Sequence, residues 1–165
     1  IARILEHPLQ VRSRVGHGSM FSITVPRGTS APRVVPASSE PATDALAGLH
    51  VLCVDNDPEI LDGMRALLHR WGVTAALATT VDEALAAIDA TMPAALLVDY
   101  HLHDRLDGLG VIAELRRRAR TDLPAALVTG DGSDALKERA REYGCVVLTK
   151  PVKPASLRAW LGAQR

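Results

Sequence analysis

Four short apolar runs, each ending on a polar or charged residue, constrain the fold more than any other feature of the sequence. The runs cover residues 51–54, 95–98, 125–128 and 146–148. They are followed in turn by Asp55, by Asp99, by Thr129, and by Thr149 with Lys150. Runs this short predict buried strands, and strands that alternate with helices predict a parallel sheet. In such sheets ligands bind beyond the carboxyl ends of the strands, so the sequence predicts that two carboxylates, a hydroxyl and an ammonium lie in one crevice.

Signals for helix starts lie between these runs. Asp57 followed by Pro58 is typical of an N-cap and a first helical position, and apolar residues then recur at helical spacing. Thr80 and Glu83 have the spacing of a capping box, in which two side chains satisfy free amides at a helix start. Pro154 predicts the start of a last helix. The predicted helices therefore alternate with the predicted strands.

Three further segments complete the predicted domain. A strand is expected over residues 74–77, and helices are expected over residues 106–118 and 133–143. The first of these helices ends on Arg116-Arg117-Arg118, which we interpret as a solvated helix end. Together with the runs above, these segments give an α/β domain with five strands and five helices.

The first part of the chain has a different pattern. Residues 9–15 and 19–25 tend to alternate apolar with polar side chains, and the Gly16-His17-Gly18 segment between them indicates a turn, so a short β-hairpin is expected. Residues 28–48 are rich in Gly, Ser, Thr and Pro and carry few large apolar side chains. This composition predicts a flexible linker between the hairpin and the α/β domain.

Composition limits the classes of partner. The 165 residues are 47% hydrophobic and 23% charged, with a formal net charge of +0. A chain without a basic field is not expected to bind nucleic acid or an anionic membrane. No uninterrupted apolar segment reaches the roughly 20 residues that a membrane-spanning helix needs. Cys53 and Cys145 lie in or beside predicted strands and are expected to be buried, reduced thiols, which favours a cytoplasmic location.

Residues 49–161 resemble the receiver domain of two-component response regulators. Four separated motifs carry the resemblance: Val54-Asp55-Asn56-Asp57, Leu97-Val98-Asp99, Val128-Thr129-Gly130 and Lys150-Pro151. The resemblance implies a flavodoxin-like parallel sheet with strand order 2-1-3-4-5. It also implies that Asp99 is phosphorylated, that Thr129 donates a hydrogen bond to the phosphoryl group, and that Lys150 supplies a countercharge.

The same resemblance implies a Mg²⁺ site. The residues it assigns as ligands are Asp55, Asn56, Asp99 and His101, the last through its backbone carbonyl. A hard cation that takes carboxylate, carbonyl and phosphate oxygens fits such a set. The family usually has two adjacent acids where this chain has Asp55-Asn56, so we expect modest Mg²⁺ affinity. Whether Asp57 turns inward to replace the missing charge, or only caps the following helix, is left open by the sequence.

The predicted hairpin carries a second resemblance. Gly16 to Phe21, followed by Ile23, Val25 and Pro26, is similar to the last glycine box and final strand of histidine-kinase ATP-binding domains. That family's other nucleotide motifs and its phosphorylated histidine have no counterpart in these residues. The chain therefore resembles the C-terminal end of a hybrid sensor histidine kinase, with a kinase remnant (1–27), a linker (28–48) and a receiver domain (49–165).

The predicted function is that of a phosphoacceptor in a two-component phosphorelay. The donor would be the phosphohistidine of a kinase dimerisation domain or of a phosphotransfer protein, and the only catalysis expected is phosphorylation and dephosphorylation of the domain itself. The alternative is a non-phosphorylated pseudo-receiver that acts as an interaction or dimerisation module, for example as a homodimer. A related phosphohydrolase would need a second Asp at the position of His101.

The route of output is also constrained. Receivers commonly have Tyr or Phe three residues before the strand-end Lys, where this chain has Val147. A β-branched aliphatic side chain has no ring to rotate between pocket and solvent. We therefore expect the output to use residues 129–133 and the helix over 133–143.

Overall fold

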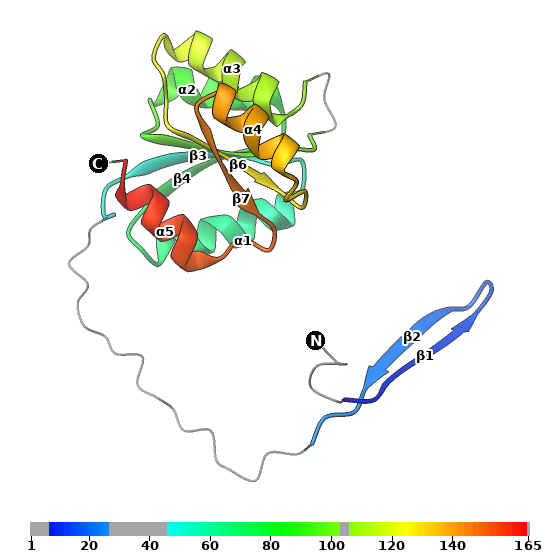
Figure 1. The fold of residues 1–165 in the computed structure, drawn as a ribbon. Helices are drawn as coiled ribbons and strands as arrows, with labels where there is room; N and C mark the ends of the chain where they lie inside the picture. Colours follow the sequence, from blue (N-terminus) through cyan, green and yellow to red (C-terminus); the bar gives the residue numbers. More distant parts are fainter. Residues whose placement is uncertain (1–6, 27–45, 103–105, 165) are drawn as a thin grey trace. The chain divides into compact units, whose positions relative to one another are not determined.

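The computed structural model describes residues 7–26, 46–102 and 106–164. The chain divides into two compact units, residues 1–40 and 41–165 (Figure 1). Most of the predicted linker (28–45) and part of the loop after Asp99 (103–105) lie outside the described residues. Of the helices described, none is long and apolar enough to cross a membrane.

The first unit contains the expected β-hairpin. Strands β1 (Leu9–Arg14) and β2 (Gly18–Ile23) pair antiparallel, with Val11 opposite Phe21. The chain reverses through Gly16 and Gly18, whose positive φ angles of 78° and 91° are readily adopted by glycine. All residues of both strands are exposed. Because side chains alternate between the two faces of a strand, the register places Leu9, Val11, Phe21 and Ile23 on one apolar face.

The second unit is built on a parallel sheet. Its strands are β3 (His50–Val54), β4 (Thr74–Ala78), β5 (Ala95–Asp99), β6 (Ala125–Thr129) and β7 (Cys145–Thr149). They lie in the order β4-β3-β5-β6-β7, which confirms the expected flavodoxin-like order 2-1-3-4-5. After β3 the chain passes to β4 on one side and then returns to β5 on the other. The strand order therefore reverses between β3 and β5, the strands that end at Asp55 and Asp99.

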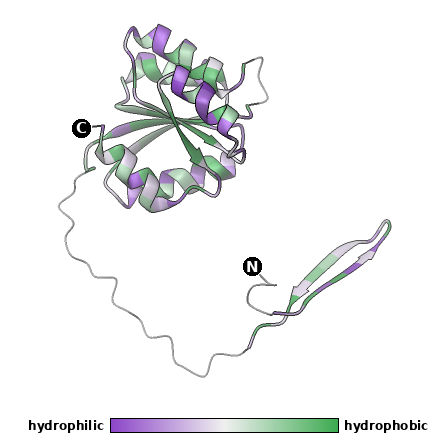
Figure 2. Cartoon of the chain, in the orientation of Figure 1, coloured by the Kyte–Doolittle hydropathy of each residue, from purple (hydrophilic) through white to green (hydrophobic). Residues whose placement is uncertain are grey.

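Helices cover both faces of this sheet (Figure 1). They are α1 (Pro58–His69), α2 (Val81–Ala90), α3 (Gly108–Ala119), α4 (Asp134–Glu142) and α5 (Pro154–Gly162). One core cluster joins α2, α3 and α4 to the sheet, and a second joins α1 and α5 to the opposite face. Figure 2 shows the strands hydrophobic and the helices hydrophilic in part. Strands buried on both faces produce the continuous apolar runs in the sequence.

The caps predicted from the sequence start two of these helices. Asp57 is the N-cap of α1, and its Oδ1 accepts a hydrogen bond of 2.9 Å from the Glu59 amide. Thr80 is the N-cap of α2 and accepts from the Glu83 amide at 3.2 Å. Glu83 Oε2 in turn accepts from the amide and hydroxyl of Thr79, at 2.7 and 2.8 Å. Side chains therefore satisfy amides at both helix starts that the helices themselves leave free.

Two residues differ from their predicted environments. Leu46 falls in the predicted linker, yet it is 2% exposed and belongs to the core on the α1 and α5 face. Arg116 does not lie on a solvated helix end, because its side chain is only 15% exposed and donates to the carbonyls of Leu123, Tyr143 and Gly144. It thereby satisfies carbonyls at and just beyond the end of α4, whereas Arg117 and Arg118 make exposed surface pairs.

Candidate functional site

Three polar side chains at neighbouring strand ends adopt the same local geometry. Asp55 Oδ1 accepts from the amide two residues later at 3.0 Å, Asp99 Oδ2 does so at 2.8 Å, and Thr129 Oγ1 at 3.0 Å. The three residues are only 6%, 5% and 0% exposed. Each of these side chains is therefore held by the start of the loop that follows it, which fixes its position at the end of the sheet.

Lys150 joins the two carboxylates. Its Nζ lies 2.7 Å from Asp99 Oδ1 and 3.1 Å from Asp55 Oδ2. The backbone amide of Lys150 donates to the Thr129 carbonyl at 2.7 Å, which attaches the lysine to the end of β6. Partial burial acts against the charged ammonium, but hydrogen bonds to Asp99 and Asp55 outweigh it and raise the pKa of Lys150. The structure thus brings together Asp55, Asp99 and Lys150, with Thr129 on the adjacent strand.

The acidic pair borders an apolar wall. A cavity of about 20 Å³ lies against Asp55 and Asp99. The rest of its lining is largely apolar and comes from β3, α1, β5 and β6: Cys53, Val54, Ile60, Leu61, Met64, Leu97 and Val128. Low polarity on this side strengthens the attraction between the carboxylates and Lys150, since fewer polar groups screen it.

The oxygen atoms of this pair and of residues close to it in the sequence are of the kind that Mg²⁺ binds. Asp55 and Asp99 offer carboxylates, Asn56 is partly buried beside them in the chain, and His101 has a backbone carbonyl two residues after Asp99. Mg²⁺ typically takes one or two carboxylates together with water and phosphate oxygens. Within the described ranges, no group of three or more His, Cys, Asp or Glu side chains could hold a metal. Of the two alternatives that the sequence left open for Asp57, the structure shows the helix cap, because Asp57 Oδ1 accepts from the Glu59 amide at the start of α1.

A family model for the response regulator receiver domain matches residues 51–161. The chain belongs to this family. An uncharacterised 14.6 kDa protein of Leptolyngbya boryana is 31% identical over 118 residues, which cover 68% of this chain and 86% of that protein. The nitrogen assimilation regulatory protein NtrX of Azorhizobium caulinodans is 32% identical over 84 residues, 50% of this chain but 18% of that protein.

Solved structures agree with the family assignment. The receiver domain of NtrX from Brucella abortus superposes with a TM-score of 0.63 at 28% identity, covering 69% of this chain and 96% of that domain. The receiver of this chain therefore has the fold of a response regulator receiver through nearly the whole length of that domain.

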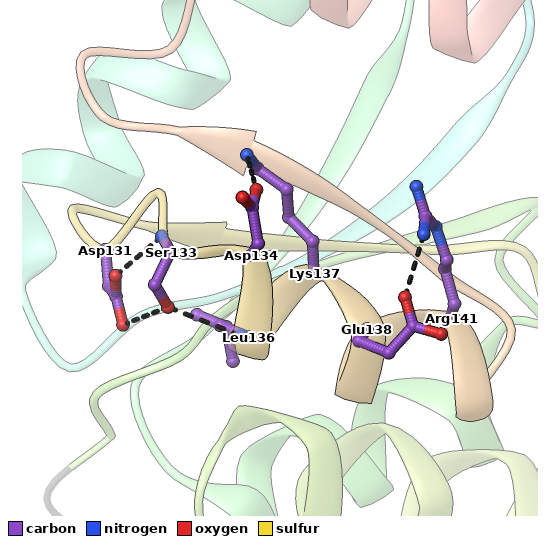
Figure 3. A network of polar contacts seen from close by, with 7 residues as sticks. All are labelled: Asp131, Ser133, Asp134, Leu136, Lys137, Glu138 and Arg141. Carbon is purple, nitrogen blue, oxygen red and sulfur yellow. Dashed lines mark hydrogen bonds and ion pairs between the residues drawn. The ribbon is translucent and has the colours of Figure 1, made fainter.

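Hydrogen bonds lead from the receiver's Thr129 to the start of α4, and Figure 3 shows those from Asp131 to Leu136. Thr129 accepts from the Asp131 amide, and Asp131 accepts from the amide and hydroxyl of Ser133 at 2.8 and 3.1 Å. Ser133 Oγ is the N-cap of α4 and accepts from the Leu136 amide at 3.3 Å. A displacement of the Thr129 hydroxyl is thus linked by side-chain contacts to the first turn of α4.

Sequence reasoning missed one contact between α4 and the loop after Asp99. Arg139 on α4 donates to the Tyr100 hydroxyl at 3.0 Å and to Asp107 Oδ2 at 3.1 Å. These partners are 39 and 32 residues away in the sequence, and neither lies in a motif with Arg139. Val147, where an aromatic residue is common in receivers, is half-buried against the same face of the sheet.

Proposed function

We propose that this receiver accepts a phosphoryl group on Asp99 from a phosphohistidine, with Mg²⁺ as cofactor. The observation that carries the proposal is the position of Lys150 Nζ, within 3.1 Å of both Asp55 and Asp99 at the point where the strand order reverses. A carboxylate can attack a negatively charged phosphoryl group only where that charge is neutralised. The Lys150 ammonium, which now pairs with both carboxylates, is close enough to Asp99 to neutralise negative charge on the oxygens of a phosphoryl group bound there.

Each residue has a defined part in this proposal. A carboxylate oxygen of Asp99 forms the bond to phosphorus as the bond from phosphorus to the histidine nitrogen breaks, and the electron pair of that bond stays on the imidazole. Thr129 Oγ1 accepts from the Asp131 amide, so its own proton is available to donate to a phosphoryl oxygen. Asp55, Asn56 and the His101 carbonyl, together with Asp99, would hold Mg²⁺, which when bound supplies positive charge to the phosphoryl oxygens.

Intact-mass measurement tests the acceptor. After incubation with acetyl phosphate and Mg²⁺, the wild-type chain should gain the mass of one phosphoryl group as acetate leaves, and Asp99→Asn should gain none. Asp62→Asn is a matched control, because Asp62 is an exposed carboxylate on α1 that pairs with Arg65. A wild-type chain without an adduct would refute phosphoacceptance and favour the interaction-module alternative.

The donor and the chain context belong to the same proposal. We infer that residues 1–27 are the end of a histidine-kinase ATP-binding domain, that 28–48 form a linker, and that 49–165 form the receiver, whose core already includes Leu46. The hairpin supports this inference, because Phe21 and Ile23 are 70% and 49% exposed on its apolar face. An isolated two-stranded hairpin is at best marginally stable, so such a face is expected to pack against further protein. Transfer of labelled phosphate from a kinase dimerisation domain to Asp99, absent in Asp99→Asn, tests the donor.

A further inference from the structure

The side chain of Arg139 joins the helix α4 to the segment after Asp99 by hydrogen bonds. Nη1 donates to the Tyr100 hydroxyl at 3.0 Å, and Nη2 donates to Asp107 Oδ2 at 3.1 Å. Tyr100 directly follows Asp99, and Asp107 is the N-cap of α3. A single planar guanidinium therefore contacts both borders of the connection between β5 and α3, a geometry that one flexible ammonium could not reproduce.

Backbone hydrogen bonds hold Tyr100, the residue that follows Asp99, on both sides. Its amide donates to the Val128 carbonyl at 2.9 Å, and its own carbonyl accepts from the Gly108 amide at 3.0 Å. Its ring meets the ring of His101 edge-on, with 4.8 Å between the centroids. The amide of His101 is the group that donates to Asp99 Oδ2 at 2.8 Å. The orientation of Tyr100 thus influences the amide that holds the carboxylate of Asp99.

The other border is equally well defined. Asp107 Oδ1 accepts from the Gly110 amide at 2.9 Å and caps α3, while its second oxygen receives Arg139. Gly108 has no room for a side chain: an added Cβ would lie 2.9 Å from the Tyr100 Cα and 2.8 Å from the Leu127 Cδ1. Because the start of α3 packs directly on the backbone after Asp99, a contact that fixes Asp107 also restrains Tyr100.

We propose that Arg139 is a positioning residue for phosphoryl acceptance. It orients Asp99 through Tyr100 and the His101 amide, and it makes α4 sensitive to the state of Asp99 without an aromatic residue on β7. This proposal rests on the proposed function of Asp99. Coupling between two sites is reciprocal, so if Arg139 favours the reactive arrangement of Asp99, a phosphoryl group on Asp99 must also alter the order of α4 at Arg139.

Amide hydrogen exchange, measured by NMR on the chain without any phosphodonor, tests the positioning role. In Arg139→Gln, we expect the His101 and Gly108 amides to exchange about fivefold faster, the size expected when hydrogen bonds of ordinary net strength are lost. Arg141→Gln is the matched control, because Arg141 lies on the same helix and pairs with Glu138 of that helix at 2.8 Å (Figure 3). The control should leave both amides unchanged.

Phosphorylation kinetics test the connection to the reaction. With acetyl phosphate and Mg²⁺, Arg139→Gln should lower the maximal rate about threefold while leaving the donor concentration for half-maximal rate unchanged, since Arg139 does not contact the donor. Tyr100→Phe removes only the hydroxyl and should reproduce part of the effect. In a Tyr100→Phe background, Arg139→Gln should lower the maximal rate by a smaller factor than it does in the wild-type background, because the two residues act through one contact.

The outcomes separate this inference from the proposed function. If the wild-type chain forms an adduct but exchange at His101 and Gly108 is the same in Arg139→Gln and wild type, or changes equally in Arg141→Gln, the positioning role of Arg139 is overturned and phosphoacceptance stands. A chain that forms no adduct at all overturns phosphoacceptance, and with it any role of Arg139 in the reaction.

Discussion

Replacing Lys150 by methionine should destabilise the receiver, because it leaves two buried carboxylates without their shared cation. The ammonium lies 2.7 Å from Asp99 Oδ1 and 3.1 Å from Asp55 Oδ2. At an effective dielectric of about 20, a pair of unit charges at such distances attracts by roughly 5 to 6 kcal/mol before desolvation is subtracted. Removing one partner of a buried pair typically costs about 3 to 5 kcal/mol.

The expected net loss is smaller than that range. The Lys150 side chain is 31% exposed, so water screens part of the attraction. We expect the free energy of unfolding to fall by about 2 to 3 kcal/mol, which lowers the melting temperature by on the order of 10 °C for a domain of this size. Lys153→Met, which removes an exposed lysine at the start of α5, is the matched control and should melt close to wild type.

Thermal melts with and without Mg²⁺ complete the test. In Lys150→Met the two carboxylates no longer share their oxygens with an ammonium, so added Mg²⁺ should raise the melting temperature more than it does in wild type. Since the pKa of Lys150 is raised above its ordinary value of 10.5, its stabilisation is fully present below pH 10.5 and is lost only as the pH rises through the raised value. A Lys150→Met protein that melts like wild type at neutral pH would show that the ion pairs contribute no net stability and would refute this reasoning.

Three other substitutions test separate features. Asn56→Asp should tighten Mg²⁺ binding about tenfold, or ~1.4 kcal/mol, and should lower the stability of the metal-free protein. The same Mg²⁺ affinity in titrations of the variant and of wild type would contradict this expectation. Gly108→Ala should cost about 2 to 3 kcal/mol in urea unfolding, because the new methyl group meets the backbone of Asp99 and Tyr100. The Thr79 amide, and then its hydroxyl, lower the pKa of Glu83 below 4.5. The extra stability of wild type over Glu83→Gln should therefore be present above pH 4.5 and disappear as the pH falls through the lowered pKa.

Local signals in the sequence were sufficient to predict the helices and strands and to predict that the charged groups lie close together. The four apolar runs end at polar residues at the carboxyl ends of the strands, and a parallel sheet brings such ends to one edge. Lys150 lies close to Asp99 because of that topology, although 51 positions separate the two residues in the sequence. The roles of these groups in phosphoryl transfer remain predictions.

Contacts that depend on the direction of single side chains were not predictable in the same way. Arg116 stands in the sequence beside Arg117 and Arg118 and has the same chemistry, yet it turns inward to carbonyls 27 and 28 residues away. Its burial depends on where α4 ends in space, which no local pattern records. The choice between a metal ligand and a helix cap for Asp57 was likewise open, and the structure shows the cap.

The two groups of the ion pair, Asp99 and Lys150, follow strands that differ in their number of neighbouring strands. Asp99 ends β5, which is hydrogen-bonded to β3 on one side and to β6 on the other. Lys150 follows β7, which among the described strands is bonded to β6 alone. Segments with fewer neighbours open at lower free-energy cost than segments in the middle of a sheet. Loosening β7 would therefore withdraw the cation while the carboxylate of Asp99 stays in place. A molecule that binds along the edge of β7 that faces away from β6 would therefore change the charge of the pocket from outside it.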